Sequence, residues 1–222
     1  VYIGESKYTE AMVEINKVLS SGYSLATKYD HLFYADNFKE NGEIILPLPL
    51  DGSTAQTWGA TTFLVSAALS DPTMQDNKRP DGTPFPKELL SLFGTGQAWS
   101  GNRPNEALVN RFKGSTIPAD TSDPRGLFWK EGRLSAEIID VKVFGTKKEG
   151  YLCTKWKNIN QDGTAGSNVT FSDIDFPMFR LADVYLMYAE CVLRGAGGDA
   201  GIALSYINSL SCLLYTSDAA DE

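Results

Sequence analysis

The sequence has few of the residues on which most catalytic and metal sites depend. It contains one histidine, His31, and three cysteines, Cys153, Cys191 and Cys212. A His-based zinc site or a Ser-His-Asp triad would have to rest on that single histidine. The cysteines have neither metal-ligand spacing nor the even number of a disulfide framework. We therefore expect a solvent or packing role for His31, a buried position for Cys191, and neither a metal nor a cofactor.

Positive charge and long apolar runs are also scarce. Lys and Arg number 20 against 28 Asp and Glu, and no stretch of the chain is rich in basic residues. This excludes the electrostatic pattern of a nucleic-acid binder. The longest apolar runs, such as residues 44–50, are far shorter than the roughly 18 residues that cross a bilayer. The hydrophobic content of 42% is nevertheless sufficient for the core of one domain, or most of one.

Helical periodicity is present near both ends of the chain. Apolar residues recur at helical spacing over 6–20, where Ser6 is the expected N-cap, and again over 179–210. In the second region the Gly-Ala-Gly-Gly sequence of residues 195–198 ends one helix, and Asp199 is placed to cap the next. The sequence therefore predicts a helical hairpin. The side chains that it predicts to be buried there are Leu181, Val184, Tyr185 and Tyr188.

The middle of the chain is rich in residues that favour turns. It predicts short helices and strands joined by long loops. The expected strands are 43–48, 136–144 and 150–157, the expected short helices are 87–93 and 105–112, and the expected loops include 51–59 and 158–168.

Two pairs of carboxylates could in principle supply the acid and base of a glycoside hydrolase: Asp173 with Asp175, and Glu131 with Glu137. Sequence proximity is weak support for such a pair. Asp173 and Asp175 precede a helix expected to begin near Phe179, where acidic residues are favoured by capping and by the helix dipole. A structural role is therefore the favoured interpretation.

The segment that leads into the hairpin carries a family resemblance. Residues 175–190 read DFPMFRLADVYLMYAE and closely resemble the signature segment of SusD/RagB proteins. Further matching segments stand upstream in the family's order, so that the resemblance covers residues 1–210. These segments are Asn41-Gly42-Glu43-Ile44-Ile45, Gln56-Thr57-Trp58-Gly59, Asp123-Pro124-Arg125 and Lys155-Trp156-Lys157-Asn158.

The resemblance implies both a fold and a function. The fold is mainly α, an α-α superhelix with tetratricopeptide-like hairpins, long irregular loops and a few short strands. The function is that of a surface lipoprotein of a Gram-negative outer membrane, which captures oligosaccharides, or peptides in some members, for a TonB-dependent SusC-like transporter. Contact with the membrane would be made only through a lipid anchor outside these residues, and no enzymatic activity is implied. A helical-repeat adaptor for a protein partner and a glycoside hydrolase remain as alternatives.

Two loop tryptophans are the candidate sugar contacts. A sugar ring has an apolar C–H face and a rim of hydroxyls, so its binding site needs an aromatic surface beside amide or guanidinium groups. For Trp99 a sugar platform and a packing role are equally expected, whereas for Trp58 packing is favoured because residues 63–65 are apolar. The expected ligand-binding residues are Trp99, Trp58, Gln56, Asn102 and Arg103, while Trp129 and Trp156 are expected in the scaffold.

The two ends of the chain differ from the rest. Residues 212–222 break the helical periodicity and resemble a translated sequencing adapter, so we take residues 1–211 as a partial SusD/RagB-like domain. We expect the deletion of residues 212–222 to leave stability and binding unchanged. The chain begins at Val1 without a signal-peptide pattern, and any targeting signal is expected upstream.

Overall fold

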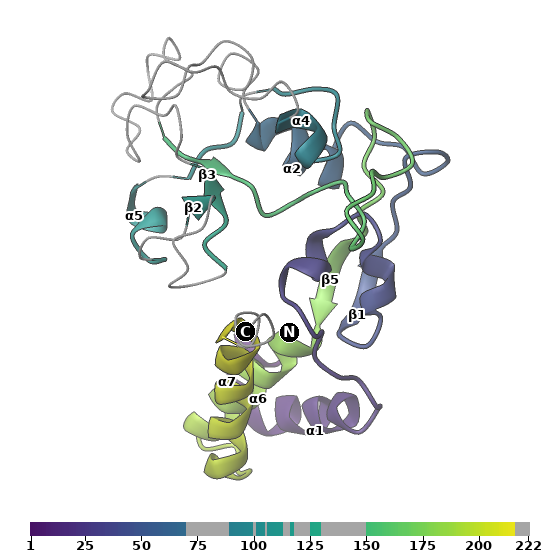
Figure 1. Cartoon of the computed structure of the whole chain (residues 1–222). Helices are drawn as coiled ribbons and strands as arrows, with labels where there is room; N and C mark the ends of the chain where they lie inside the picture. Colours follow the sequence, from purple (N-terminus) through teal and green to yellow (C-terminus); the bar gives the residue numbers. More distant parts are fainter. Residues whose placement is uncertain are drawn as a thin grey trace. The chain divides into compact units, whose positions relative to one another are not determined.

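The computed structural model describes residues 1–69, 89–99, 101–104, 106–112, 116–117, 125–129 and 150–215 (Figure 1). The chain divides into two compact units. The loop unit takes its residues from 33–37 and 49–176, and the helical unit from 1–32, 38–48 and 177 onward. The described residues are mainly helical with a few short strands, as the sequence predicts.

The described part of the loop unit contains helix α2, two short helices and a small sheet. Helix α2 spans Ala60–Ala68, and the short helices α4 and α5 span Leu89–Leu92 and Glu106–Val109. In the sheet, β2 (Thr116–Ile117) runs parallel to β3 (Phe128–Trp129), which pairs antiparallel with β4 (Leu152–Cys153). The core residues of this unit are Val65, Leu69, Phe93, Trp129, Leu152 and Ile174.

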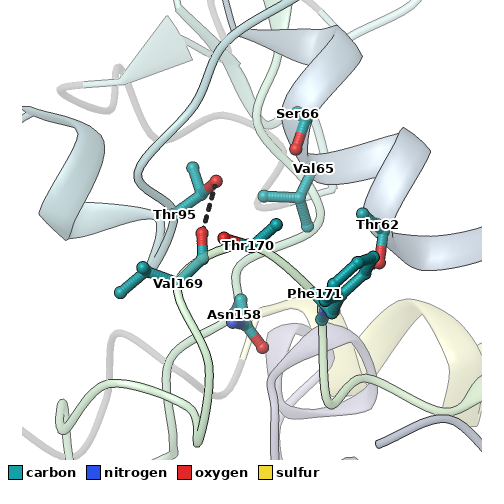
Figure 2. A pocket seen from close by; sticks show the side chains of 9 residues that line it. Thr62, Val65, Ser66, Thr95, Asn158, Val169, Thr170 and Phe171 are labelled. Carbon is teal, nitrogen blue, oxygen red and sulfur yellow. Dashed lines mark hydrogen bonds between the residues drawn. The ribbon is translucent and has the colours of Figure 1, made fainter. Parts of the chain in front are cut away.

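A small cavity lies between α2 and the loops that cover it. Thr62, Val65 and Ser66 of α2 face residues 169–171 across it, and the Thr95 hydroxyl donates to the Val169 carbonyl oxygen (Figure 2). The cavity measures about 10 Å³, which is the space of a single water molecule. It is a packing feature of the loops, and it is too small to admit a ligand.

Several sequence predictions are confirmed in the loop unit. Trp129 is buried in β3, and Trp156 lies between Phe33 and Phe176 with ring centroids 5.0 and 5.8 Å away, so both belong to the scaffold. The strand expected over 150–157 is limited to β4, and the one expected over 136–144 lies outside the described residues. Helix α2 was not predicted.

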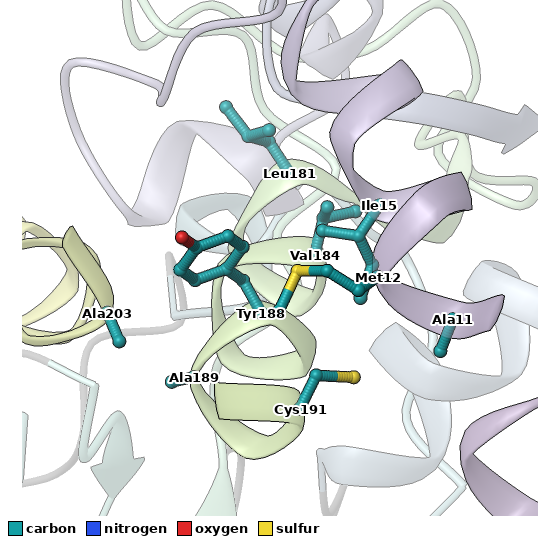
Figure 3. Close-up of a cluster of buried hydrophobic side chains, with 9 residues drawn as sticks. All are labelled: Ala11, Met12, Ile15, Leu181, Val184, Tyr188, Ala189, Cys191 and Ala203. Carbon is teal, nitrogen blue, oxygen red and sulfur yellow. The ribbon is translucent and has the colours of Figure 1, made fainter. Parts of the chain in front are cut away.

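Three α-helices pack together in the described part of the helical unit. Helix α6 (Leu181–Leu193) packs against both α1 (Tyr8–Leu19) and α7 (Ala200–Tyr215). The predicted helical hairpin is confirmed, and Figure 3 shows its core, in which Leu181, Val184 and Tyr188 of α6 lie with residues of α1. The complete set of buried side chains is Ala11, Met12, Ile15, Leu181, Val184, Tyr188, Ala189, Cys191 and Ala203.

The hairpin turn follows the prediction closely. Gly195, Gly197 and Gly198 have positive φ, and a Cβ on Gly198 would lie 3.2 Å from the Met12 side chain. The Asp199 carboxylate accepts the Ile202 N–H at 2.8 Å, as expected of an N-cap. Helix α7 continues to Tyr215, past the expected end at 210. Residues 216–222, most of the expected adapter segment, lie outside the described residues.

Two details of the helical unit differ from the sequence predictions. Ser6 has φ 58°, because it ends a 3-10 helix (η1, Ile3–Glu5), and α1 begins only after Lys7, so Ser6 does not cap α1. Tyr185 is half-buried: its ring stacks on Tyr206 at 4.0 Å, near the edge of the hairpin core.

A buried ion pair joins the remaining elements of the helical unit. Strand β1 (Ile44–Leu48) pairs with β5 (Phe176–Arg180), and the carboxylate of Glu43 accepts hydrogen bonds from the Ala26 N–H at 2.8 Å and the Arg180 guanidinium at 3.1 Å. Burial raises the pKa of Glu43, while the Ala26 N–H and Arg180 oppose that shift. The same residue's carbonyl oxygen accepts the Leu181 N–H, so Glu43 fixes the start of α6.

The single histidine and the buried cysteine lie where packing roles are expected. His31 lies in a 3-10 helix (η2, Asp30–Phe33), with its Nδ1 3.6 Å from a carboxylate oxygen of Glu40 at the end of a second one (η3, Asn37–Glu40). Cys191 is fully buried in α6. Among the described helices, none has the length and apolar character needed to cross a membrane.

Candidate functional site

Four aromatic rings gather on the surface of the loop unit. Trp58 lies with its ring centroid 6.0 Å from that of Trp99 and 4.7 Å from that of Phe171, and Phe63 lies 6.2 Å from Trp99. Trp58 is 59% exposed and Phe63 is 42% exposed, so the group presents apolar ring surface to solvent. We call Trp58, Phe63, Trp99 and Phe171 the aromatic platform. Neighbouring aromatic rings that are exposed to solvent mark this surface as a candidate binding site.

Helix α2 positions the first two rings. Trp58 stands just before the helix, and Ala60, with φ 47°, turns the chain from the loop into it. Trp58 does not enter the core, since it is 59% exposed, and the packing favoured for it is limited to ring contact with Phe171 and Trp99 at the surface. The apolar residues 63–65 lie on a helix, where Val65 faces the core and Phe63 faces solvent beside Trp99. The ring neighbours of Trp58 are Trp99 and Phe171 at the surface of the unit.

The loop that carries Trp99 is anchored to the C-terminal end of α2. The backbone N–H of Trp99 donates to the Ser66 carbonyl oxygen at 2.8 Å. The backbone N–H groups of Gly101 and Asn102 both donate to the carbonyl oxygen of Ala67. These bonds satisfy carbonyl groups at the end of the helix that would otherwise lack a partner. Trp99 is half-buried as a result, and its ring is held against the exposed side of α2.

The third segment of the platform contributes Phe171. The Asn168 side-chain oxygen accepts the N–H of Thr170 at 2.7 Å and that of Phe171 at 3.2 Å, which shapes the turn. The next residue, Ser172, donates its N–H to the Thr62 hydroxyl of α2 at 3.0 Å. All three segments are thus bonded to the same helix or carried by it.

A buried asparagine holds the loops beneath the platform. Asn158 donates its amide protons to the carbonyl oxygens of Gly94 and Asn168, and its side-chain oxygen accepts the Asp173 N–H at 2.9 Å. Gly94 has φ 63°, and a Cβ there would lie 1.8 Å from the Asn158 carbonyl oxygen. Only glycine fits this position, so the approach of the two loops depends on it.

The polar candidates lie on the same segments as the tryptophans. Gln56 is exposed, and its amide donates to the Gly52 carbonyl oxygen at 2.7 Å, which holds it on the loop before Trp58. Asn102 and Arg103 are half-buried; Asn102 is the last of the residues bonded to α2, and Arg103 directly follows it. The structure therefore brings Trp58 and Trp99 into ring contact and places the three polar residues next to them along the chain.

Sequence reasoning missed two of the platform's four rings. Phe171 stands in a loop without periodicity, and no local signal connects it with Trp58. Phe63 belongs to α2, which was not predicted; its apolar pattern of Phe63, Leu64 and Val65 followed by Ala67 and Ala68 was the available signal. The amide of Gln97, which accepts the indole N–H of Trp99, was missed for the same reason as Phe171.

The carboxylates of the hydrolase alternative are engaged in holding loops. Asp173 accepts the Gly52 N–H at 2.6 Å and the Ser167 hydroxyl at 2.7 Å, and Asp175 accepts the Leu50 N–H at 2.9 Å. Burial raises the pKa of Asp175, against the opposing effect of the Leu50 N–H. The structural interpretation is supported, although the capping mechanism is wrong: β5 separates both residues from α6.

The capping role at α6 belongs to another acid. The Asp183 carboxylate accepts the Arg180 N–H at 3.3 Å, in the first turn of the helix. The other carboxylate pair, Glu131 and Glu137, lies outside the described residues.

Comparison with known proteins connects the chain with one family. The model of the SusD family matches residues 139–211. The chain is 31% identical over 240 residues to the starch-binding protein SusD of Bacteroides thetaiotaomicron, an alignment that covers 90% of this chain and 40% of that protein. The chain thus spans about 40% of the length of this curated relative.

Solved structures share the fold. A SusD superfamily protein from Parabacteroides distasonis matches with a TM-score of 0.60 at 17% identity, over 95% of this chain and 39% of that one. Surface glycan-binding protein A from Bacteroides thetaiotaomicron, in complex with laminarihexaose, matches with a TM-score of 0.56 at 16% identity, over 95% and 44% of the two chains. A laminarin-binding SusD-like protein matches with a TM-score of 0.57 at 20% identity, over 94% and 44%.

Proposed function

Because this chain belongs to the SusD family, we propose that it is part of a surface protein that captures oligosaccharides for import through a TonB-dependent, SusC-like transporter. Location at the outer membrane of a Gram-negative bacterium, through a lipid anchor outside these residues, is part of the proposal. So is a role in binding without cleavage. The proposal is supported by the relatives, one of which is named for starch binding and two of which are described with laminarin or laminarihexaose.

The aromatic platform is the observation that carries this proposal. The C–H face of a pyranose ring gains both apolar burial and favourable electrostatics when it lies on an aromatic face. The exposed ring of Trp58, with the rings of Trp99 and Phe171 6.0 and 4.7 Å away, offers such faces to more than one sugar unit. The cavity that Phe171 helps to line measures about 10 Å³ and is too small for a sugar, so the proposed ligand lies on the exposed ring surface.

We propose that polar side chains at the platform's margin bind the sugar hydroxyls. Gln56, Asn102 and Arg103 provide amide and guanidinium groups, which can each bind two neighbouring hydroxyls. Neutral sugars are held by stacking and hydrogen bonds, so the affinity should change little between low and moderate salt.

Removing either tryptophan ring is expected to weaken binding. The Trp58→Ala and Trp99→Ala variants should each lose about 1 to 3 kcal/mol of binding free energy, because a stacking face and its buried area are both lost. Since Trp58 is the more exposed of the two, its variant should fold normally and give the cleaner result. Calorimetric titration of maltooligosaccharides and laminarihexaose against the full-length protein measures the change.

The matched control is Phe38→Ala. Phe38 is 61% exposed, much like Trp58, and belongs to the helical unit, so its removal should leave the affinity unchanged. Equal affinities for the wild type and both tryptophan variants would remove the platform from the binding site. Release of new reducing ends from the oligosaccharide by the wild-type protein would overturn the proposal of binding without cleavage.

The adaptor alternative depends on another surface. In the helical unit a groove of about 380 Å³ is lined by residues of η1, α1 and α6, including Ile3, Ile15 and Met187. This groove is the surface that a protein-binding role would use. The Met187→Lys variant should therefore keep its oligosaccharide affinity, and a loss equal to that of Trp58→Ala would contradict the assignment of binding to the platform.

A further inference from the structure

We infer that Gln97 is a positioning residue of the platform, which sets the orientation of the Trp99 ring and joins it to the segment that carries Phe171. The inference rests on the proposed function, because Trp99 is taken to contact the sugar. Gln97 itself is half-buried and is assigned no contact with the ligand.

The amide of Gln97 is bonded at both of its ends. Its side-chain oxygen accepts the indole Nε1–H of Trp99 at 3.3 Å, and its side-chain nitrogen donates to the Thr170 carbonyl oxygen at 2.9 Å. If the amide were rotated by half a turn, its N–H₂ group would face the indole N–H of Trp99 and its oxygen would face the Thr170 carbonyl oxygen, so neither hydrogen bond could form. The two partners therefore determine one orientation of the amide.

The hydrogen bond between Gln97 and the Trp99 indole fixes the orientation of the ring, which the backbone contacts do not fix. The backbone N–H of Trp99 donates to the Ser66 carbonyl oxygen. This bond fixes the position of the residue but leaves the indole ring free to rotate about its side-chain torsions. A hydrogen bond to Nε1–H at the far side of the indole removes that freedom. The face of the ring that meets the ligand is then set before binding.

The second bond links two parts of the platform that are far apart in sequence. Thr170 precedes Phe171, whose ring lies 4.7 Å from that of Trp58, while Trp58 lies 6.0 Å from Trp99. Gln97 thus connects Trp99 to the segment that carries Phe171 by hydrogen bonds. Phe171 in turn contacts Trp58, and Trp58 contacts Trp99. Rings held in a fixed arrangement lose less conformational entropy when a ligand binds, which raises affinity without any new contact.

The Gln97→Met variant tests this role. Methionine has a similar length and volume but can replace neither hydrogen bond, so the affinity for the best-bound oligosaccharide should fall about three- to tenfold, the effect of one or two modest hydrogen bonds. The ¹H–¹⁵N resonance of the Trp99 indole, assigned by its disappearance in Trp99→Phe, should move upfield as its hydrogen bond is lost. Gln161→Met, the same change at another half-buried glutamine of the loop unit, should alter neither quantity.

A double variant separates positioning from direct contact. Phenylalanine at position 99 keeps an aromatic face but has no N–H, so in the Trp99→Phe background Gln97→Met should weaken binding by less than about twofold. An equal loss in both backgrounds would overturn the inference, because Gln97 would then act on the ligand or on the whole fold. An unchanged affinity with a shifted indole resonance would overturn it as well.

Failure of the proposed function would look different. If the wild-type protein bound no oligosaccharide of the panel, the proposed function would fail. The inference would then be judged on the indole resonance and on the ring-to-ring nuclear Overhauser contacts between Trp58 and Trp99. The inference would be overturned if the Gln97→Met variant kept both the position of the indole resonance and the ring-to-ring contacts. An upfield shift of the resonance together with weaker contacts would support it.

Discussion

Replacing Arg180 with methionine is expected to lower the free energy of unfolding by about 3 to 5 kcal/mol, because it leaves a carboxylate buried without its cationic partner. The Glu43 side chain is 0% exposed, and its oxygen accepts the Arg180 guanidinium at 3.1 Å. The pair connects residues 137 positions apart, at the point where the β1–β5 ribbon leads into α6. Chemical denaturation followed by circular dichroism measures the loss.

The loss should depend on pH in a defined direction. Burial raises the pKa of Glu43 above its ordinary value of 4.5, so between that value and the raised one the folded state binds more protons than the unfolded state. The contribution of Glu43 to stability is therefore fully present below about pH 4.5 and is lost as the pH rises through the folded-state pKa. Without Arg180 the pKa of Glu43 rises further, so the variant's deficit should be small near pH 4 and should grow as the pH rises.

Two further variants make this result interpretable. Arg194→Met removes a guanidinium from an exposed pair with Glu190, at 3.6 Å on the same helix, and should cost less than about 1 kcal/mol. Adding Glu43→Gln to Arg180→Met should recover part of the loss, because a neutral amide can still accept the Ala26 N–H. A deficit that was equal at pH 4 and pH 7 would contradict the assignment of the loss to an unpaired buried charge.

Truncating Leu181 to alanine is expected to cost about 2 to 5 kcal/mol, through lost apolar burial and the cavity left behind. Leu181 is 1% exposed and begins α6 in the core between α1 and α7. Leu186→Ala is the matched control, since Leu186 lies on the same helix but is 52% exposed. The unfolding midpoints of the two variants in one denaturant series measure the difference.

The comparison with Leu186 also excludes a propensity effect. Leucine and alanine are both strong helix formers, so the substitution itself changes intrinsic helicity little at either position. If both variants lost the same stability, the core assignment of Leu181 would fail and the hairpin would have to bury another face.

The hairpin was predictable because its signals are local. A period of 3.6 residues places Leu181, Val184 and Tyr188 on one face, and Gly195 with Asp199 marks the turn and the next cap. Each of these signals lies within about a turn of the structure it specifies. The same reasoning misplaced Tyr185, since periodicity predicts which face is apolar but not how far along that face the partner helix extends.

The candidate site was only half predictable. Trp58 and Trp99 could be selected because tryptophans between glycines and polar residues are hard to place in a core. Their partner Phe171 could not, because it is 113 residues from Trp58 in the chain and no local pattern connects them. The roles of Asp173 and Asp175 were misassigned for a related reason: their partners, Gly52 and Leu50, are likewise more than a hundred residues away.

By itself the sequence determined the scarcity of catalytic groups, the helical hairpin, the turn-rich middle and the resemblance of residues 175–190 to one family. All of these depend on composition or on spacing between near neighbours. The tertiary structure alone decided that Trp58, Phe63, Trp99 and Phe171 form one surface, that Gln97 connects two of its segments, and that Glu43 meets Arg180. These arrangements arise from hydrogen bonds and packing between distant segments, whose geometry is set only when the chain has closed around α2 and α6.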